Sequence, residues 1–131
     1  MHDPIADMIV RIKNASDSRK KSVVFTYSKL KFAILDVLLK EGFIKSFSFG
    51  KKGKKVIKFI EVVLAYQDKI PKINGVARVS KTSKRIYQKS KNIQKVKNGI
   101  GSLILSTSKG IMTDKNAKVA NLGGEALFKI W

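Results

Sequence analysis

Apolar residues near the start of the chain recur at the spacing of one helix face. The members of this stripe are Ile5, Met8, Ile9 and Ile12. Asp3 followed by Pro4 predicts where the helix begins, because an aspartate can cap the first turn and proline fits the first helical position. We expect the helix to end near Asn14 and residues 16–21 to form a polar loop.

A strand and a second helix are predicted next. Residues 22–27 are rich in β-branched and aromatic side chains, which favours a short strand. Ser28 is placed to cap a helix that runs to about Glu41 and is closed by Gly42. The expected core stripe of this helix is Leu30, Ala33, Ile34, Val37 and Leu38.

Two further β-rich segments, residues 43–49 and 56–65, flank a turn with two glycines and predict a hairpin. The turn carries a lysine cluster at residues 51–55, which is a phosphate-binding patch, a localisation signal or a solvated hairpin tip. Helix, strand, helix, strand, strand in this order predict a small α/β unit.

After Tyr66 the pattern changes to short strand candidates. These are residues 75–80, 84–87, 102–106 and 125–131, with one brief helix capped by Asp114 and running to about Asn121. We therefore expect an α+β protein with an N-terminal α/β domain at residues 1–68. It packs on a mostly β C-terminal domain with a short helix at residues 69–131, because each half is too small to bury a core alone.

Positive charge is the next feature that changes the interpretation. The chain of 131 residues has a net charge of +19, and between Lys69 and Thr113 it carries eleven Lys or Arg residues and no Asp or Glu. Such a domain repels itself unless a polyanion neutralises it, and nucleic acid fits because its counterions are released on binding. A lysine-rich composition is also expected of an AT-rich coding genome. Only four of the 28 basic residues are arginine, so the charge favours phosphate contact over base recognition.

The residue inventory argues against an enzyme. There is no cysteine, and His2 is the only histidine, so a metal site, a cofactor and a Ser-His-acid triad are not expected. No apolar run approaches the roughly 18–20 residues that cross a bilayer. The N-terminus lacks the pattern of a secretory signal, so we expect a cytoplasmic protein with no membrane partner.

Three consecutive hydroxyl residues, Ser106, Thr107 and Ser108, precede Lys109 and Gly110. Hydroxyls suit the RNA minor groove, where 2′-hydroxyls and base edges are displayed. The alternative is an ordinary strand-to-helix turn that uses its hydroxyls as caps. A phosphate-binding P-loop is not favoured, because its two glycines and Lys-Ser/Thr pair are absent at the required spacing.

Tyr87 lies among Lys84, Arg85 and Lys89, an arrangement that suits stacking on an unpaired base. The alternative is a strand that buries one face. Gly124 and Glu125 leave two interpretations open as well. The carboxylate accepts from a base amino group or orients a neighbouring lysine, or else the glycines end a helix and Glu125 begins the last strand.

At these positions the sequence resembles the family of bacterial small ribosomal subunit protein eight. The matching segments, in order along nearly the whole chain, are residues 3–8 (DPIADM), 11–14 (RIKN), 28–31 (SKLK), 41–44 (EGFI), 78–80 (RVS), 85–87 (RIY), 99–101 (GIG), 106–114 (STSKGIMTD) and 122–125 (LGGE). The nine-residue segment is highly specific.

The resemblance implies a two-domain protein that binds the central domain of the small-subunit RNA early in assembly, inside the ribosome. The compartment would be the bacterial cytosol or an organelle of bacterial origin. It also implies neighbouring small-subunit proteins as partners, and some family members bind and repress their own messenger. The RNA-binding residues implied for the C-terminal domain are Lys81, Arg85, Tyr87, Ser106, Thr107, Ser108, Lys109, Gly110, Gly124 and Glu125. Those implied for the N-terminal domain are Arg11, Lys13, Asn14, Lys29 and Lys31.

One departure from the family pattern concerns the turn between Lys81 and Arg85. The family usually has Pro-Gly there, whereas this chain has Thr82, Ser83 and Lys84. We expect a less rigid turn. Two rival functions stay open at this point: a DNA regulator, which needs a recognition helix less apolar than the second predicted helix, and an RNA-modifying enzyme, which needs a base or metal ligand.

Overall fold

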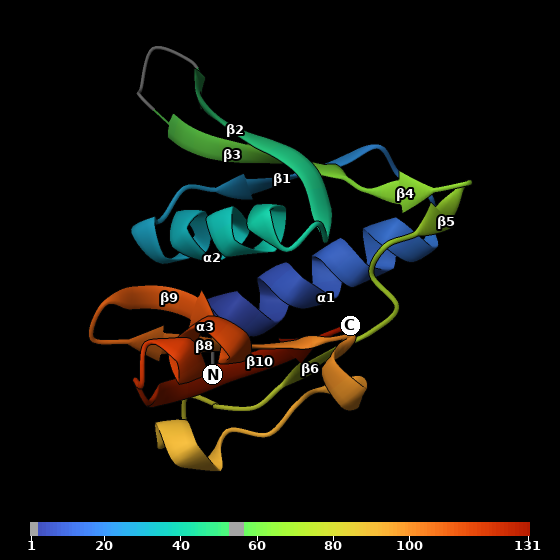
Figure 1. The fold of residues 1–131 in the computed structure, drawn as a ribbon. Coiled ribbons are helices and arrows are strands. Elements are labelled where there is room, and N and C mark those ends of the chain that lie inside the picture. Colours follow the sequence, from blue (N-terminus) through green and yellow to red (C-terminus); the bar gives the residue numbers. More distant parts are fainter. Residues whose placement is uncertain (1–2, 53–56) are drawn as a thin grey trace. The chain divides into compact units, whose positions relative to one another are not determined.

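The computed structural model describes residues 3–52 and 57–131, with the backbone only for residues 51, 52 and 57. The elements in chain order are α1 (Pro4–Asp17), β1 (Ser22–Thr26), α2 (Lys29–Lys40), β2 (Ile44–Lys52), β3 (Ile57–Leu64), β4 (Tyr66–Gln67), β5 (Ile70–Pro71), β6 (Val76–Arg78), β7 (Tyr87–Gln88), two 3₁₀ turns η1 (Ser90–Asn92) and η2 (Lys97–Gly99), β8 (Ser102–Thr107), β9 (Gly110–Thr113), α3 (Asp114–Val119) and β10 (Gly124–Ile130) (Figure 1). The fold is α+β, as predicted.

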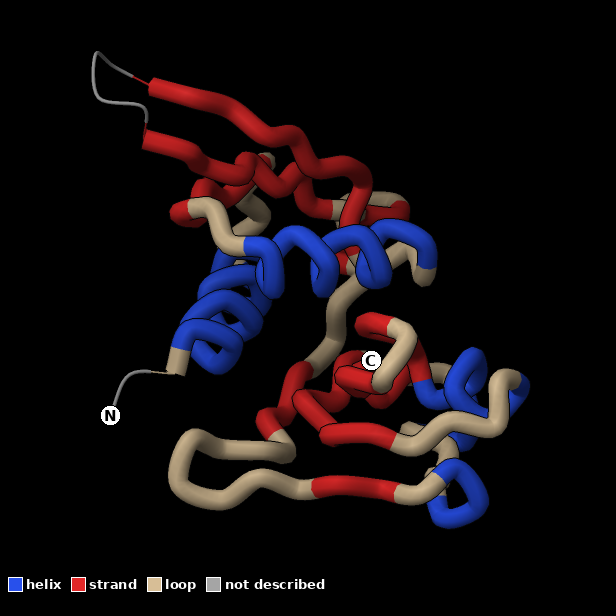
Figure 2. The backbone as a smooth tube through the Cα atoms, turned by 90° about the vertical axis from the view of Figure 1, so that its left-hand side faces the viewer, coloured by secondary structure: helices blue, strands red, loops and turns tan. Residues whose placement is uncertain are grey.

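The chain divides into two compact units. One, here the N-terminal unit, is Asp7–Ile73; the other, here the C-terminal unit, combines Met1–Ala6 with Asn74–Trp131. In the N-terminal unit, β1, β3 and β2 form an antiparallel sheet in that order, and β2 and β3 run side by side towards the predicted hairpin turn (Figure 2). The lysine cluster predicted at residues 51–55 lies mostly outside the described residues.

Helix α1 begins as predicted. The backbone N–H of Ala6 donates to the Asp3 carboxylate at 3.2 Å, and all four residues of the expected stripe are buried. The predicted end near Asn14 is wrong, because the helix continues to Asp17. Arg19 then adopts a left-handed φ of 58°, while N–H groups of Arg19 and Lys20 bond back to carbonyls of Ser16 and Ala15. This termination normally uses glycine, and its absence explains why the sequence pattern missed it.

Helix α2 has both predicted caps. Ser28 accepts from the N–H of Lys31 at 3.1 Å, and Gly42 has a φ of +82° just past the helix. The predicted core stripe is only partly right. The buried residues are Ile34, Leu35 and Leu38, whereas Leu30 is 41% exposed. The buried face of α2 is therefore shifted towards Leu35 relative to the face expected from the spacing of apolar residues.

In the C-terminal unit, β10 is the central strand of the sheet, which has the order β6, β10, β8, β9. Strand β7 pairs with the beginning of β10 and β6 with its later half. One face is covered by a core cluster of Ile93, Val96, Leu103, Leu105, Ala117 and Ala126. These residues come from the segments around η1 and η2, from α3 and from two strands, so the small helix completes the core.

Several short elements differ from prediction. The segment predicted as a strand at residues 84–87 forms only β7, and the strand predicted at 75–80 is β6. The cap of α3 is Thr113, which accepts from the N–H of Asn116 at 3.3 Å, and the helix ends at Val119. The β4–β5 hairpin and β9 were not predicted. Their partners are set by tertiary pairing, and elements this short have little periodicity.

Candidate nucleic-acid interface

A row of three side chains crosses the C-terminal sheet. Glu125 on β10 is directly opposite Tyr87 on β7 and Ser106 on β8. Residues directly opposite one another in antiparallel strands point to the same face. The Tyr87–Glu125–Ser106 row therefore lies on one face, and the Tyr87 side chain at its edge is 71% exposed.

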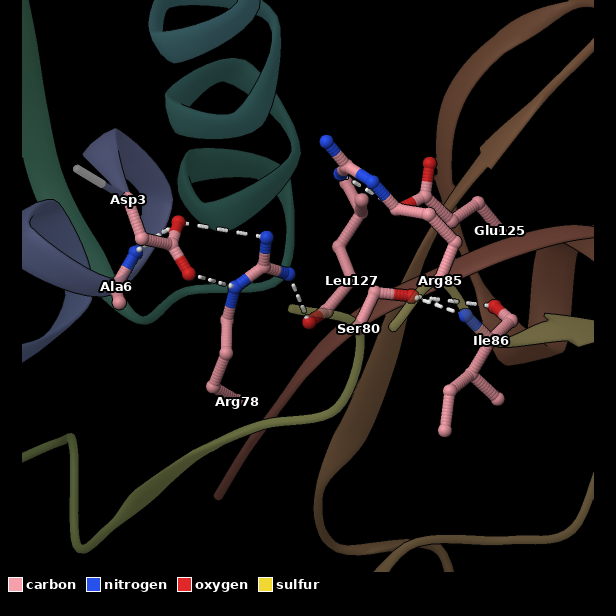
Figure 3. Close-up of polar contacts among 8 residues, drawn as sticks. All are labelled: Asp3, Ala6, Arg78, Ser80, Arg85, Ile86, Glu125 and Leu127. Atoms are coloured by element: carbon pink, nitrogen blue, oxygen red, sulfur yellow. Dashed lines mark hydrogen bonds and ion pairs between the residues drawn. The ribbon is translucent and has the colours of Figure 1, made fainter. Parts of the chain in front are cut away.

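Glu125 is held by an ion pair with Arg85, a residue outside this row. A guanidinium nitrogen of Arg85 donates to its carboxylate at 3.1 Å (Figure 3). The carboxylate side chain is 18% exposed and that of Arg85 is 47% exposed. Glu125 thus lies at the start of the last strand, which begins at Gly124, and the cation that it orients is Arg85 instead of the lysine expected from the sequence.

The loop that carries Arg85 is closed by Ser80. Its buried hydroxyl accepts from the N–H of Ile86 at 2.8 Å and donates to the carbonyl of Ile86 at 3.2 Å (Figure 3). Lys81 and Lys84 exchange two backbone hydrogen bonds of 2.9 and 3.0 Å. A tight turn forms here without Pro-Gly, and Arg85 follows it directly, shortly before Tyr87.

The hydroxyl segment is the tip of a β-hairpin, so the strand-to-helix turn considered from the sequence is wrong. Thr107 pairs with Gly110 across a two-residue turn, and β9 separates that turn from α3. The Thr107 hydroxyl accepts from the N–H of Lys109 at 3.2 Å and donates to the carbonyl of Gly110 at 2.8 Å. Within the described residues, the Ser106 and Ser108 hydroxyls have no hydrogen-bond partner and are free to donate to a ligand.

The close approach of β8 and β10 requires glycine at residue 124. A Cβ atom on Gly124 would lie 2.2 Å from the Ser106 carbonyl oxygen and 3.1 Å from the Thr107 Cα. Both obstacles are backbone, so neither can rotate away. Gly124 therefore sets how closely Glu125 and Ser106 are aligned.

The middle of β10 is fixed by a β-bulge at Leu127. The register with β8 shifts there, so that Ala126 faces Leu105 but Phe128 faces Ile104. The guanidinium of Arg78 and the N–H of Val79 both donate to the Leu127 carbonyl. Bulges re-aim side chains along a strand. Here the bulge puts Glu125 and Phe128 on the same face, although they are three residues apart.

Asp3 holds Arg78 in place for this contact. Its carboxylate accepts from the guanidinium at 3.1 Å and from the backbone N–H of Ala6 (Figure 3). Burial by itself raises the pKa of Asp3, but the Arg78 hydrogen bond, the Ala6 N–H and the Arg78 charge outweigh it. The net result is a pKa below the ordinary value.

Arg11 and Asn14 line a polar pocket of about 380 Å³ in the N-terminal unit, together with Ser18, Lys20 and Ser22. The Arg11 guanidinium donates to the Val24 carbonyl at 3.0 Å and lies 4.5 Å from the centre of the Phe25 ring. These contacts hold the Arg11 guanidinium group in position. Ser18, Lys20 and Ser22 were not among the predicted site residues, although the polar segment around them was the available signal.

The other predicted basic residues of this unit are not gathered at that pocket. Lys13 is tied to the Asp17 carboxylate at 2.6 Å on the same helix, which reduces its use for phosphate. Lys31 donates to the Thr26 hydroxyl at 3.2 Å, and Lys29 is exposed at the first residue of α2. The N-terminal candidates therefore form two groups, one at the pocket and one at the start of α2.

Among the described residues, no three His, Cys, Asp or Glu side chains gather where a metal ion would bind. His2 lies outside the described residues. None of the helices within residues 3–52 and 57–131 is long and apolar enough to span a membrane.

The chain was compared with known proteins. The sequence model of one family, described as Ribosomal protein S8, matches residues 3–131. A protein of Petrotoga mobilis named small ribosomal subunit protein uS8 is 46% identical over 98% of both chains. Proteins of the same name from Dictyoglomus thermophilum and Mycoplasmopsis synoviae are 49% and 48% identical, each over 98% of this chain and 97% of the relative.

Proposed function

The chain belongs to the ribosomal protein S8 family, and from this premise we propose that it is a non-enzymatic structural constituent of the small ribosomal subunit that binds ribosomal RNA. The relatives are named as small-subunit proteins. The observation that carries the RNA-binding part is the Tyr87–Glu125–Ser106 row, which lies beside a hairpin tip with free hydroxyls.

We propose that the overall positive charge supplies general RNA affinity and that this row selects the RNA site. Lysines distributed over a chain of net charge +19 attract the RNA backbone and make affinity depend on salt. The row then selects the site. Tyr87 offers a ring for stacking, and Ser106 and Ser108 offer hydrogen bonds to 2′-hydroxyls and base edges. The ion pair between Arg85 and Glu125 fixes the positions of these two side chains beside Tyr87 and Ser106.

Three finer features are part of the proposal. The RNA site lies in the central domain of the small-subunit RNA, and binding helps assembly in the ribosome of the bacterial cytosol. The part at residues 69–131 carries the selective contacts, with Lys81, Lys109, Gly110 and Gly124 supporting the row. The part at residues 1–68 contacts further RNA through Arg11, Asn14 and the lysines at the start of α2, and neighbouring subunit proteins and the protein's own messenger are further partners.

The test removes two hydroxyls without changing charge. In the double variant Ser106→Ala and Ser108→Ala, we expect affinity for a central-domain RNA helix to fall by about tenfold or more, because each lost hydrogen bond contributes about 0.5–1.5 kcal/mol. Affinity for an unrelated RNA duplex should hardly change. Filter binding at constant salt measures both.

Thr107→Ser is the matched control, because it keeps the hydroxyl that closes the hairpin. Equal losses on both RNAs would show that the tip only tunes general affinity. A wild-type protein that does not sediment with small-subunit RNA from cells would refute the proposed function as a whole.

A further inference from the structure

Four aromatic rings form a continuous cluster in the N-terminal unit that the RNA-binding row does not include. The cluster consists of Phe47, Phe32, Tyr27 and Phe49, in order of contact. Successive ring centres are 5.0, 6.2 and 5.1 Å apart, and the two shorter contacts are edge-to-face. The cluster joins the first turn of α2 to the edge strand β2.

The cluster is incompletely buried. Phe49 is 44% exposed and Phe32 is 38% exposed, whereas Phe25 and Ile60, which share a cross-strand row with Phe49, are almost fully buried. The row therefore runs from a closed core to an open edge. Large aromatic side chains gathered at an open edge indicate a binding surface more often than an accident of packing.

One lysine lies over a ring of the cluster, and two more are near its rings in the sequence. Lys58 places its ammonium 5.8 Å from the centre of the Tyr27 ring. Lys31 reaches back to Thr26, the residue before Tyr27, and Lys29 is exposed one turn before Phe32. Glu61, which belongs to the same sheet, points to the opposite face, because it lies one position from Ile60.

We propose that this cluster, with Phe49 at its exposed edge, is a stacking site for unpaired bases of a single-stranded RNA segment. The inference rests on the proposed function and adds the kind of RNA that the N-terminal unit binds. Aromatic faces flanked by lysines suit single strands, because the rings stack on bases while the ammonium groups meet phosphates. A protein partner is disfavoured, because lysine is depleted in protein interfaces.

The main test uses Phe49→Leu, which keeps an apolar side chain and the charge but removes the ring. We expect its affinity for a short oligouridylate to fall at least about fivefold, because a stacked base contributes that much or more to binding. Affinity for a blunt RNA duplex should stay unchanged. Phe49→Tyr should restore the oligouridylate affinity, since its ring also stacks. Fluorescence anisotropy at constant salt measures all of these.

The matched control is Ile70→Ala, because Ile70 is a 61% exposed apolar residue on β5 of the same unit, outside both the aromatic cluster and the Arg11 pocket. Thermal unfolding checks that each variant is folded. Photo-crosslinking of a 4-thiouridine oligonucleotide gives an independent result: the cross-linked peptide should contain Phe49 or Phe32 in addition to any that contains Tyr87.

Equal effects of Phe49→Leu and Ile70→Ala on oligouridylate binding would overturn the inference. Unchanged RNA affinity combined with loss of a subunit protein from reconstituted particles would overturn it too, and would assign the cluster to a protein partner. In both cases binding of the wild-type protein to central-domain RNA would leave the proposed function intact. Absence of that binding would remove the proposed function as well.

Discussion

Substitution of Gly124 by alanine tests whether the spacing of β8 and β10 controls RNA binding by the Tyr87–Glu125–Ser106 row. The added Cβ would sit 2.2 Å from the Ser106 carbonyl oxygen and 2.9 Å from its carbonyl carbon. An ordinary contact needs more than an ångström of extra space. Because both obstacles are backbone, the strands must separate where Glu125 and Ser106 pair.

Two consequences are expected. Overpacking of this kind costs about 1–3 kcal/mol, so Gly124→Ala should be less stable by that amount in urea unfolding. For a chain of this size the loss lowers Tm by roughly 3–10 °C. At a temperature where both proteins are fully folded, affinity for central-domain RNA should still fall about tenfold, because Ser106 moves relative to Glu125 and Tyr87.

Ile34→Val is the control for stability alone. Ile34 is fully buried in α2 of the N-terminal unit, and its shortening costs about 0.5–1.5 kcal/mol without touching the row. It should leave RNA affinity unchanged. Unaltered stability of Gly124→Ala would show that the strands relax without strain. Lost stability with normal RNA affinity would refute the claim that selection depends on the alignment of the row.

Two further predictions concern charged side chains that are held in place. Asp3→Asn keeps the helix cap but removes the charge facing Arg78, and should cost about 1–2 kcal/mol at neutral pH. Because the folded-state pKa of Asp3 is lowered, its contribution is present above about 3.9, the unfolded value, and is lost as pH falls through the folded value. The stability difference between wild type and variant, measured by urea unfolding across pH, should shrink in that acidic range, and a constant difference would contradict this. Arg11→Lys keeps the charge but loses the guanidinium hydrogen bond to the Val24 carbonyl and the stacking on the Phe25 ring. The variant should therefore be less stable by about 0.5–2 kcal/mol. The salt slope of RNA binding should be unchanged because the positive charge is kept, and a shallower slope would contradict this by showing that the phosphate contact needs the guanidinium itself.

Much of the local structure could be predicted because its causes are local. The caps at Asp3 and Ser28, the glycine after α2 and the β2–β3 hairpin all depend on neighbours within a few residues. The end of α1 could not be predicted in the same way. It uses Arg19 in a left-handed conformation, where sequence rules look for glycine.

The candidate site was predictable by residue type but not by arrangement. Tyr87, Glu125 and the hydroxyl segment were identified through the family resemblance and their chemistry. Their alignment in one row depends on the pairing of three strands that are far apart in sequence. The aromatic cluster was not predicted either, since each of its rings alone looks like an ordinary core residue.

The sequence by itself determined the net charge, the lack of cysteine, and the starts of α1 and α2, because these are properties of composition and short segments. Only the tertiary structure decided which side chains share one face of the C-terminal sheet. The bulge at Leu127 puts Glu125 on the same face as Phe128, the close approach at Gly124 sets the spacing of β8 and β10, and Glu125 pairs with Arg85 from a distant segment. Register and ion-pair choice depend on contacts between distant segments, and no local pattern encodes those contacts.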